Sequence, residues 1–261
     1  MTLITYAIWS YITVDWNKKN KMSGNDIIIS MLLRGVLMPF IFVNSGLRNT
    51  TAAAIAALAI YNNLYKKHRT RELIALFFIA FTIHFSIIYV IIVYALARLY
   101  SVKIASIALF IWTNVVPVVA TQFKNSPYEI LRKMASSFTI YTGKRGFGGN
   151  LYLLGAYVVL FSLIVSLALM RKNRGIEDNL GIKNFFILMI MNALFNLGYT
   201  QVTLRPLYTL GVMSSPVLYY MYGGEYRENK NQQILAIMSI FVGLAFVLRV
   251  SLPEYFVITY C

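Results

Sequence analysis

The stretch VNSGLRNTTAAAIAALAIYNNLYKKHRTRELIALFFIAFTIHFSIIY, residues 43–89, decides the fold class of this chain. It is mostly apolar, and a basic turn at 66–71 divides it. Apolar runs of this length are typical of helices that cross a lipid bilayer. Yet the stretch keeps Arg48 and His84 close to or inside those runs. Ionisable groups are costly in a membrane, so both residues need an explanation.

The whole chain follows the same composition. It has 261 residues, of which 59% are hydrophobic. This predicts an all-α fold, a polytopic transmembrane helix bundle of about seven to nine apolar segments. We expect a single integral membrane domain over residues 1–261, without a cleavable signal peptide. The candidate spans are 1–14, 27–45, 50–65, 73–97, 104–122, 151–170, 185–203, 207–222 and 234–250.

Charge is strongly unbalanced, with 24 Lys and Arg against 9 Asp and Glu. In a membrane protein, basic loops set the topology and contact anionic lipid headgroups, so no nucleic acid partner is expected. Basic residues outside the cytoplasmic loops have a second explanation, an anionic substrate. The clusters placed in the cytoplasm are 18–21, 66–71, 171–174 and 227–230.

One conflict follows from this orientation. Three candidate spans separate the clusters at 66–71 and 171–174, whereas two cytoplasmic ends require an even number. Either 104–122 is a re-entrant or interfacial segment, or the cluster at 171–174 lies outside.

The longest polar stretch, 123–150, is predicted to be a basic extracytoplasmic loop. Topology is a poor explanation for its charge, because basic loops favour the cytoplasmic side. Its segment TGKRGFGGN, residues 142–150, combines four glycines with Lys144 and Arg145. Such a segment suits an anion clamp, and it is equally typical of an ordinary mobile loop.

Arg48 and His84 each have two interpretations. Arg48 could extend to the membrane interface, or its guanidinium could bind phosphate in a bidentate manner. His84 could be a packing residue near the middle of the span 73–97, or it could accept a proton or donate to an anion. Ser86 is two positions away, so on a continuous helix it would not share a face with His84.

A second candidate region surrounds Arg205. Pro206 disfavours helix at the residue before it, so we expect a helix break at Arg205. Tyr199 and Tyr208 flank this position and suit either interfacial anchoring or stacking on sugar rings. Arg34 lies inside an apolar run and requires a partner or a wet cavity.

Several function classes are disfavoured. No metal-ligand, phosphate-loop or nucleophile-elbow motif is present in the sequence, so neither a metal nor a cofactor is expected. No acidic residue lies inside a confident span, which argues against an ion-coupled carrier. The only cysteine is Cys261, so no internal disulfide can form.

The order of these features resembles the EpsG-like, Wzy-type polysaccharide polymerases. That family typically has a small residue, glycine and arginine at an outer helix end, an alanine-rich helix, a lysine-rich turn, and a helix with His-x-Ser. It often has glutamine after the arginine, where this chain has Asn49. The matching residues are Ser45, Gly46, Arg48, the turn 66–71, His84 and Ser86, with Arg205 and Tyr208 resembling a later element.

The resemblance implies a metal-independent glycosyltransferase-type polymerase in the bacterial cytoplasmic (inner) membrane. Such enzymes join undecaprenyl-diphosphate-linked oligosaccharide repeats into O-antigen or exopolysaccharide at the outer leaflet. Membrane lipid is a further expected partner, and the resemblance is also consistent with a protein partner that regulates chain length. The residues it marks as catalytic are Arg48, His84 and Arg205. Among the residues expected to bind substrate, the resemblance marks Ser45, Gly46, Ser86 and Tyr208. The residue-level arguments above add Arg34, Lys144, Arg145 and Tyr199.

Two other classes stay open at this point. A flippase or transporter of lipid-linked sugar needs the same cations but no acid or base. The other is a non-catalytic membrane partner that modulates a polymerase. For the polymerase we expect Arg48 and Arg205 to converge on one cavity, with His84 deeper in it and Lys144 and Arg145 closing over it.

Overall fold

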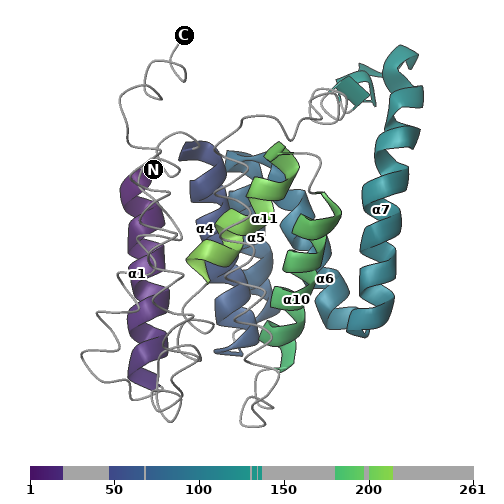
Figure 1. Ribbon diagram of the computed structural model, residues 1–261. Helices are drawn as coiled ribbons and strands as arrows, with labels where there is room; N and C mark the ends of the chain where they lie inside the picture. Colours follow the sequence, from purple (N-terminus) through teal and green to yellow (C-terminus); the bar gives the residue numbers. More distant parts are fainter. Residues whose placement is uncertain are drawn as a thin grey trace, which may run out of the picture.

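The described part of the chain is a bundle of helices (Figure 1). The computed structural model describes residues 1–19, 47–67, 69–129, 131–133, 135–136, 180–196 and 200–213. Over these ranges there is no strand, which confirms the all-α class. The elements are α1 (Thr2–Lys19), α4 (Leu47–Leu64), α5 (Thr70–Ile83), η1 (Phe85–Ile87), α6 (Ile88–Leu99), α7 (Val102–Gln122), η2 (Phe123–Asn125), α10 (Leu180–Phe195) and α11 (Thr200–Val212).

Among the described helices, none is both long enough and apolar enough to cross a bilayer. The transmembrane character of the bundle therefore stays a prediction. The candidate spans 27–45, 151–170 and 234–250 lie outside the described residues.

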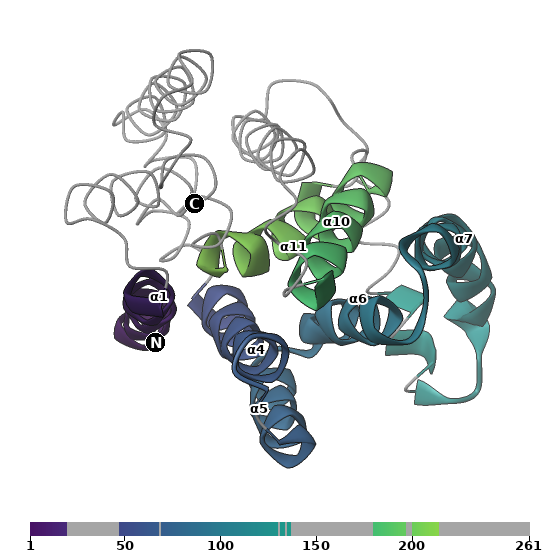
Figure 2. The same ribbon diagram turned by 90° about the horizontal axis from the view of Figure 1, so that it is seen from below.

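Helix α4 lies at the centre of the described bundle. Its alanines at 52–54, 56, 57 and 59 are all at most 3% exposed. Small side chains allow neighbouring backbones to approach closely, and α1, α5 and α11 all pack against this helix. Figure 2 shows α4 between α1 and α6, with α5 beside it. The alanine-rich segment therefore serves as the packing axis of the described helices.

Helices α1 and α4 run parallel in a fixed register. The hydroxyl groups of Thr5 and Thr51 lie 3.3 Å apart near one end. At the other end, Tyr61 donates a 2.7 Å hydrogen bond to Asp15. Both pairs have the same offset of 46 positions. Because the two helices are parallel, the basic C-terminal end of α1 lies beside the turn that follows α4. This end carries Lys18 and Lys19.

The predicted span 73–97 is wrong as a single helix. Helix α5 ends at Ile83, the three-residue turn η1 follows, and α6 starts at Ile88. His84 has an extended backbone, with φ −155° and ψ 117°. Its ring accepts a hydrogen bond from the Ser86 amide, and such a side-chain bond to nearby backbone competes with helix continuation.

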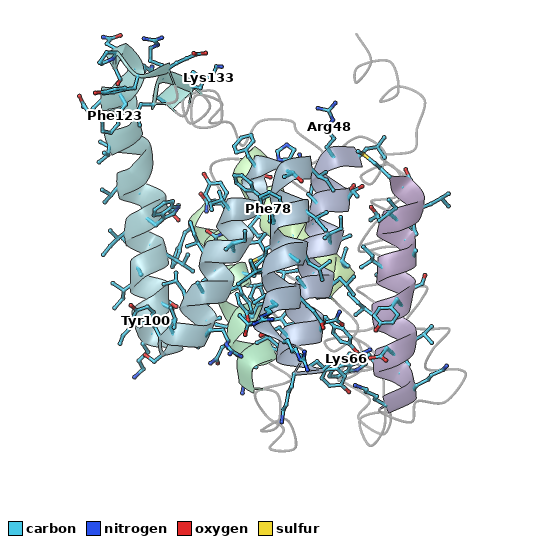
Figure 3. All side chains as sticks on the ribbon, turned by 180° about the vertical axis from the view of Figure 1, so that it is seen from behind. Arg48, Lys66, Phe78, Tyr100, Phe123 and Lys133 are labelled. Carbon is cyan, nitrogen blue, oxygen red and sulfur yellow. The ribbon has the colours of Figure 1, made fainter. Side chains whose placement is uncertain are left out.

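This break makes α5 and α6 a hairpin within the described bundle. Figure 3 places Lys66, before α5, and Tyr100, after α6, at the same end of the bundle. Helix α7 then runs without interruption to Gln122, next to Phe123 at the opposite end of the bundle. Whether this segment is re-entrant or interfacial in a membrane stays a prediction.

A helix break at Arg205 was also predicted, and it is wrong. Helix α11 continues through Arg205 and contains Pro206 in its interior. Proline removes one backbone hydrogen bond, at a cost on the order of 3 kcal/mol. The residues after it are deeply buried, with Leu207 at 4% and Leu210 at 0% exposure. Burying two leucines contributes about 1.5–3 kcal/mol each, enough to offset the proline.

A polar cluster fastens α1 to the end of α4. Asp15 pairs with Lys66 at 3.0 Å and with Lys19 at 3.9 Å, in addition to its bond from Tyr61. Burial alone would raise the pKa of Asp15. The hydrogen bonds from Tyr61 and Lys66, together with the two nearby lysine charges, outweigh burial and lower the pKa below its ordinary value of 3.8. The carboxylate therefore stabilises the fold in its ionised form.

We predict that Asp15→Asn lowers the free energy of unfolding by about 1–3 kcal/mol at neutral pH, because two lysines lose a partly buried partner. Since the folded-state pKa of Asp15 is lowered, its contribution is complete above pH 3.8 and is lost as pH falls through the lowered pKa. Unfolding of the purified protein, followed at pH values from 7 down to 2, measures both effects.

The matched control is Glu129→Gln. Glu129 also pairs with a lysine, Lys133, but the two side chains are 67% and 75% exposed. Exposed ion pairs contribute little, so this change should alter stability by less than about 0.5 kcal/mol. Equal effects of the two substitutions, or an Asp15→Asn difference that persists unchanged at the lowest pH, would contradict the role given to Asp15.

Candidate functional site

A hydrogen bond between Ser86 and Asn49 joins two helical segments that are distant in the sequence. The Ser86 hydroxyl donates to the Asn49 side-chain oxygen at 3.2 Å, across 37 positions. Asn49 lies in the first turn of α4, and Ser86 lies in η1. The turn between α5 and α6 is thereby fixed against the start of the central helix.

His84 forms a hydrogen-bonded cluster with Ser86 and Asn49. Its Nδ1 atom lies 2.7 Å from the Ser86 hydroxyl and 3.2 Å from the Ser86 amide nitrogen. The ring also stacks on Phe85, with the ring centres 5.2 Å apart and the planes 17° from parallel. The ring therefore has a fixed orientation, held by one hydroxyl, one amide and one aromatic face.

The expectation that Ser86 would not face His84 is wrong. That expectation assumed a continuous helix, in which residues two positions apart diverge. Because the backbone at His84 is extended and the next residues form η1, the serine folds back onto the ring. His84 accordingly lies at the end of α5, beside the start of α4, rather than in the middle of a helix.

Ser86 and His84 in this cluster, and Arg48 beside it, differ in how far their side chains are exposed to solvent. Ser86 is 3% exposed, whereas His84 is half-buried and Arg48 is exposed. A buried serine hydroxyl cannot reach a substrate without rearrangement of the turn. The groups available to a ligand are thus the imidazole and the guanidinium, and the serine connects His84 to α4.

Arg48 lies next to this cluster in the chain, at the first turn of α4. Figure 3 shows its side chain projecting beyond the end of the helix, away from the bundle. The helix N-terminus adds its own partial positive charge and unpaired backbone amides. This end of α4 therefore favours a negatively charged group.

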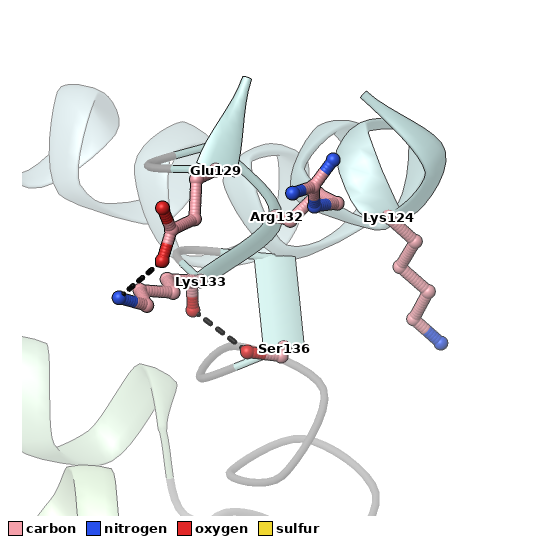
Figure 4. Close-up of a pocket in the computed structure, with 5 residues that line it drawn as sticks. All are labelled: Lys124, Glu129, Arg132, Lys133 and Ser136. Atoms are coloured by element: carbon pink, nitrogen blue, oxygen red, sulfur yellow. Dashed lines mark hydrogen bonds and ion pairs between the residues drawn. The ribbon is translucent and has the colours of Figure 1, made fainter. Parts of the chain in front are cut away.

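The same end of the bundle carries the start of the predicted basic loop 123–150. Its described part forms a shallow hollow of about 480 Å³ (Figure 4). Lys133 pairs with Glu129 at 2.6 Å, and Arg132 donates to the Ser126 carbonyl at 3.0 Å. The hollow holds more cations than acids, so its rim is positive. It is lined by Lys124, Glu129, Arg132, Lys133 and Ser136.

The structure brings some of the predicted site residues together and does not describe the placement of others. His84 and Ser86 are in contact, beside the turn of α4 that holds Arg48. Tyr208 is partly buried and packs against the apolar core. Arg205 lies in α11, and its side chain is outside the described part, so its convergence with Arg48 stays a prediction. The residues outside the described ranges are Arg34, Ser45, Gly46, Lys144, Arg145 and Tyr199.

Asn49 is the member of the cluster that sequence reasoning did not assign to the site. In the sequence it is only a departure from the glutamine that often follows the arginine in the resembling family. A useful signal was its position directly after Arg48, at a helix start, where a short polar side chain is able to reach a neighbouring turn.

No metal site is evident in the ranges that the structure describes, where no three histidine, cysteine or acidic side chains gather. Metal independence stays a prediction.

Comparison with known proteins gives one match. The model of the EpsG family matches residues 1–260, which is nearly the whole chain. No curated protein matches the chain, and no solved structure does.

Proposed function

The chain belongs to the EpsG family, which indicates a polysaccharide-polymerase-like role, and we propose that it is a membrane glycosyl polymerase. In this proposal it joins undecaprenyl-diphosphate-linked oligosaccharide repeats into O-antigen or exopolysaccharide at the outer leaflet of the bacterial cytoplasmic membrane. Arg48 stabilises the diphosphate leaving group, and His84 accepts the proton of the attacking hydroxyl. No metal takes part.

A membrane location is supported by the outward faces of the described helices. Helix α5 exposes Ile74 at 62% and Phe78 at 68%, and α7 exposes Ile107 at 61% and Val118 at 62%. Water-soluble proteins rarely leave such continuous apolar faces uncovered, whereas lipid chains would cover them without cost.

The proposed orientation of the bundle in the membrane is supported by the charges at its two ends. The end with Lys66 also holds Lys18 and Lys19, and Arg98 and Lys103 flank Tyr100 there. This end is the cytoplasmic one if basic residues set the topology. Arg48 and the positive hollow at the opposite end would then face the outer leaflet, where topology does not account for their charge.

One observation carries the proposed chemistry: the Asn49–Ser86 hydrogen bond places the His84 turn beside the helix start that holds Arg48. A hydroxyl needs a proton acceptor as it attacks, and a diphosphate needs fixed cations as it leaves. A guanidinium and a half-buried imidazole on one end of a bundle satisfy both needs.

The proposed step balances as follows. The acceptor-sugar hydroxyl oxygen attacks the anomeric carbon of the growing chain, and a new C–O bond forms. The C–O bond to the polyprenyl diphosphate breaks, and the diphosphate keeps the electron pair. The hydroxyl proton moves to His84, which becomes an imidazolium, while the guanidinium of Arg48 bonds the departing phosphate oxygens.

We predict that Arg48→Lys lowers polymer formation at least tenfold, and Arg48→Gln roughly 10²- to 10³-fold, since the lysine keeps the charge but loses the bidentate geometry. The measurement is polymerisation of purified lipid-linked repeat by the purified chain. Arg71→Lys, at the opposite end of the bundle, is the control and should leave the rate unchanged. Near-normal polymer from Arg48→Lys would reduce Arg48 to an interfacial anchor.

Replacement of His84 separates the polymerase from a flippase. His84→Gln should lower turnover roughly 10²- to 10⁴-fold while binding of the lipid-linked repeat persists, because only proton transfer is lost. The control is His68→Gln, which removes the chain's other histidine. If the purified chain forms no polymer but moves lipid-linked sugar across vesicles, and His84→Gln moves it equally well, the transporter alternative is favoured instead.

The hairpin of α5 and α6 gives a sharp test of topology. Single cysteines at Ser101 and Asn125, in a chain whose Cys261 is replaced, lie at opposite ends of α7. An impermeant thiol reagent applied to intact cells should label Asn125→Cys and spare Ser101→Cys. A single helix over 73–97 would instead place Ser101 outside, so the reverse labelling pattern would contradict both the hairpin and the outer position of Arg48.

A further inference from the structure

The positive hollow that follows α7 contains more basic charge than its own acid can balance. Glu129 is the acidic side chain among its lining residues, and it pairs with Lys133 at 2.6 Å. Within the described ranges no carboxylate pairs with Lys124 or Arg132, and both of these side chains are exposed. Lys124 and Arg132 are therefore the cations that the hollow offers to an anion.

The guanidinium of Arg132 is held by one of its nitrogens, which leaves its other edge available. The Nη1 atom donates to the carbonyl oxygens of Ser126 and Pro127, at 3.0 Å and 3.3 Å. The Nε–H and Nη2–H groups lie along the other edge, and a pair of this kind binds two oxygens of one phosphate. Figure 4 shows this guanidinium apart from the Glu129–Lys133 pair. Arg132 is thus oriented for a phosphate by the backbone of its own loop.

An apolar stripe runs along α7 toward the hollow. Its exposed side chains recur every three or four residues, a spacing that places them on one face of a helix. They are Ile104, Ile107, Ile111, Val115 and Val118, and each is between 48% and 62% exposed. Exposed Phe123 and Tyr128 lie on either side of Lys124 in the sequence, and aromatic residues are typical of the membrane–water interface. A free phosphate or an acidic sugar would use only the hollow, whereas a phospholipid would use the hollow and the stripe.

We infer that the hollow binds the phosphate of an anionic phospholipid whose acyl chains lie along the stripe of α7. Arg132 makes the bidentate contact, and Lys124 adds a second positive charge. Helix α7 packs against α6 and α10 at one edge of the described helices, whereas Arg48 belongs to α4 (Figure 2). This peripheral position favours a resident bilayer lipid over the substrate. The inference rests on the proposed membrane location and does not depend on the polymerase chemistry.

Binding of phosphatidylglycerol to the purified full chain in detergent micelles, measured by native mass spectrometry, tests the inference. The chain should retain phosphatidylglycerol in preference to phosphatidylcholine, which has no net charge. Arg132→Gln should weaken this binding roughly tenfold or more, and Arg132→Lys by a smaller factor, since lysine keeps the charge but not the two-pronged geometry. Glu129→Gln should act in the opposite direction and tighten binding roughly two- to fivefold, because Lys133 then becomes available to the lipid.

Arg71→Gln is the matched control. It removes the same charge from another exposed arginine, at the opposite end of the bundle, and should change the affinity less than about twofold. Glycerophosphoglycerol, the same headgroup without acyl chains, should bind at least roughly tenfold more weakly than the lipid, because it makes no contact with the stripe. An equal loss in Arg71→Gln, equal binding of the deacylated headgroup, or unchanged binding in Arg132→Gln would overturn the inference.

Undecaprenyl diphosphate, added as a competitor, distinguishes a bilayer lipid from the proposed substrate. At equal concentration it should leave phosphatidylglycerol bound, and its preferential binding through Arg132 would assign the hollow to the substrate and overturn the inference. Phosphatidylglycerol binding that depends on Arg132, in a chain that forms no polymer, would support the inference and contradict the proposed function. Polymer formation by a chain whose lipid binding is unchanged in Arg132→Gln would overturn the inference and leave the proposed function in place.

Discussion

The hydrogen bond from Ser86 to Asn49 is the constraint on which the rest of this arrangement depends. It joins a three-residue turn to the start of the central helix across 37 positions of sequence. Together with the bond from the Ser86 amide to the His84 ring, it fixes the turn in the apolar run that holds His84. In this arrangement α5 and α6 form a hairpin, the imidazole is held by Ser86 and Phe85, and His84 lies at the bundle end that holds Arg48.

A second constraint acts at the opposite end. There, Asp15 holds Lys66 and Lys19 in a cluster that fastens α1 to α4. The burial of Asp15 is offset by hydrogen bonds and by two opposite charges, so its pKa stays lowered. One end of the bundle thus uses its cations for structure. The other end leaves Arg48 exposed, beside the turn of α4 that is joined to the hydrogen-bonded His84 turn, and the proposed anion site draws on this arrangement.

Between these ends, α4 connects the two constraints. Its alanines permit close approach of α1, α5 and α11, so the whole helix is fixed in register with its neighbours. The parallel pairing with α1 keeps the same offset at both ends. The position of Arg48 is therefore set by packing along the full length of the helix, whereas its guanidinium stays accessible.

The sequence by itself determined the helical class, the alanine-rich central helix, the basic turn after it, and Arg48, His84 and Ser86 as residues of interest. Composition, periodicity and residue order carry these features, because each depends on residues close together in the chain. The sequence did not determine the break at His84, the continuity of α11 through Pro206, or the part played by Asn49. Local rules favour a continuous helix in an apolar run and a break before proline. In both places contacts with distant residues opposed the local preference: the hydrogen bond that Ser86 donates to Asn49 at one, and burial against the core at the other.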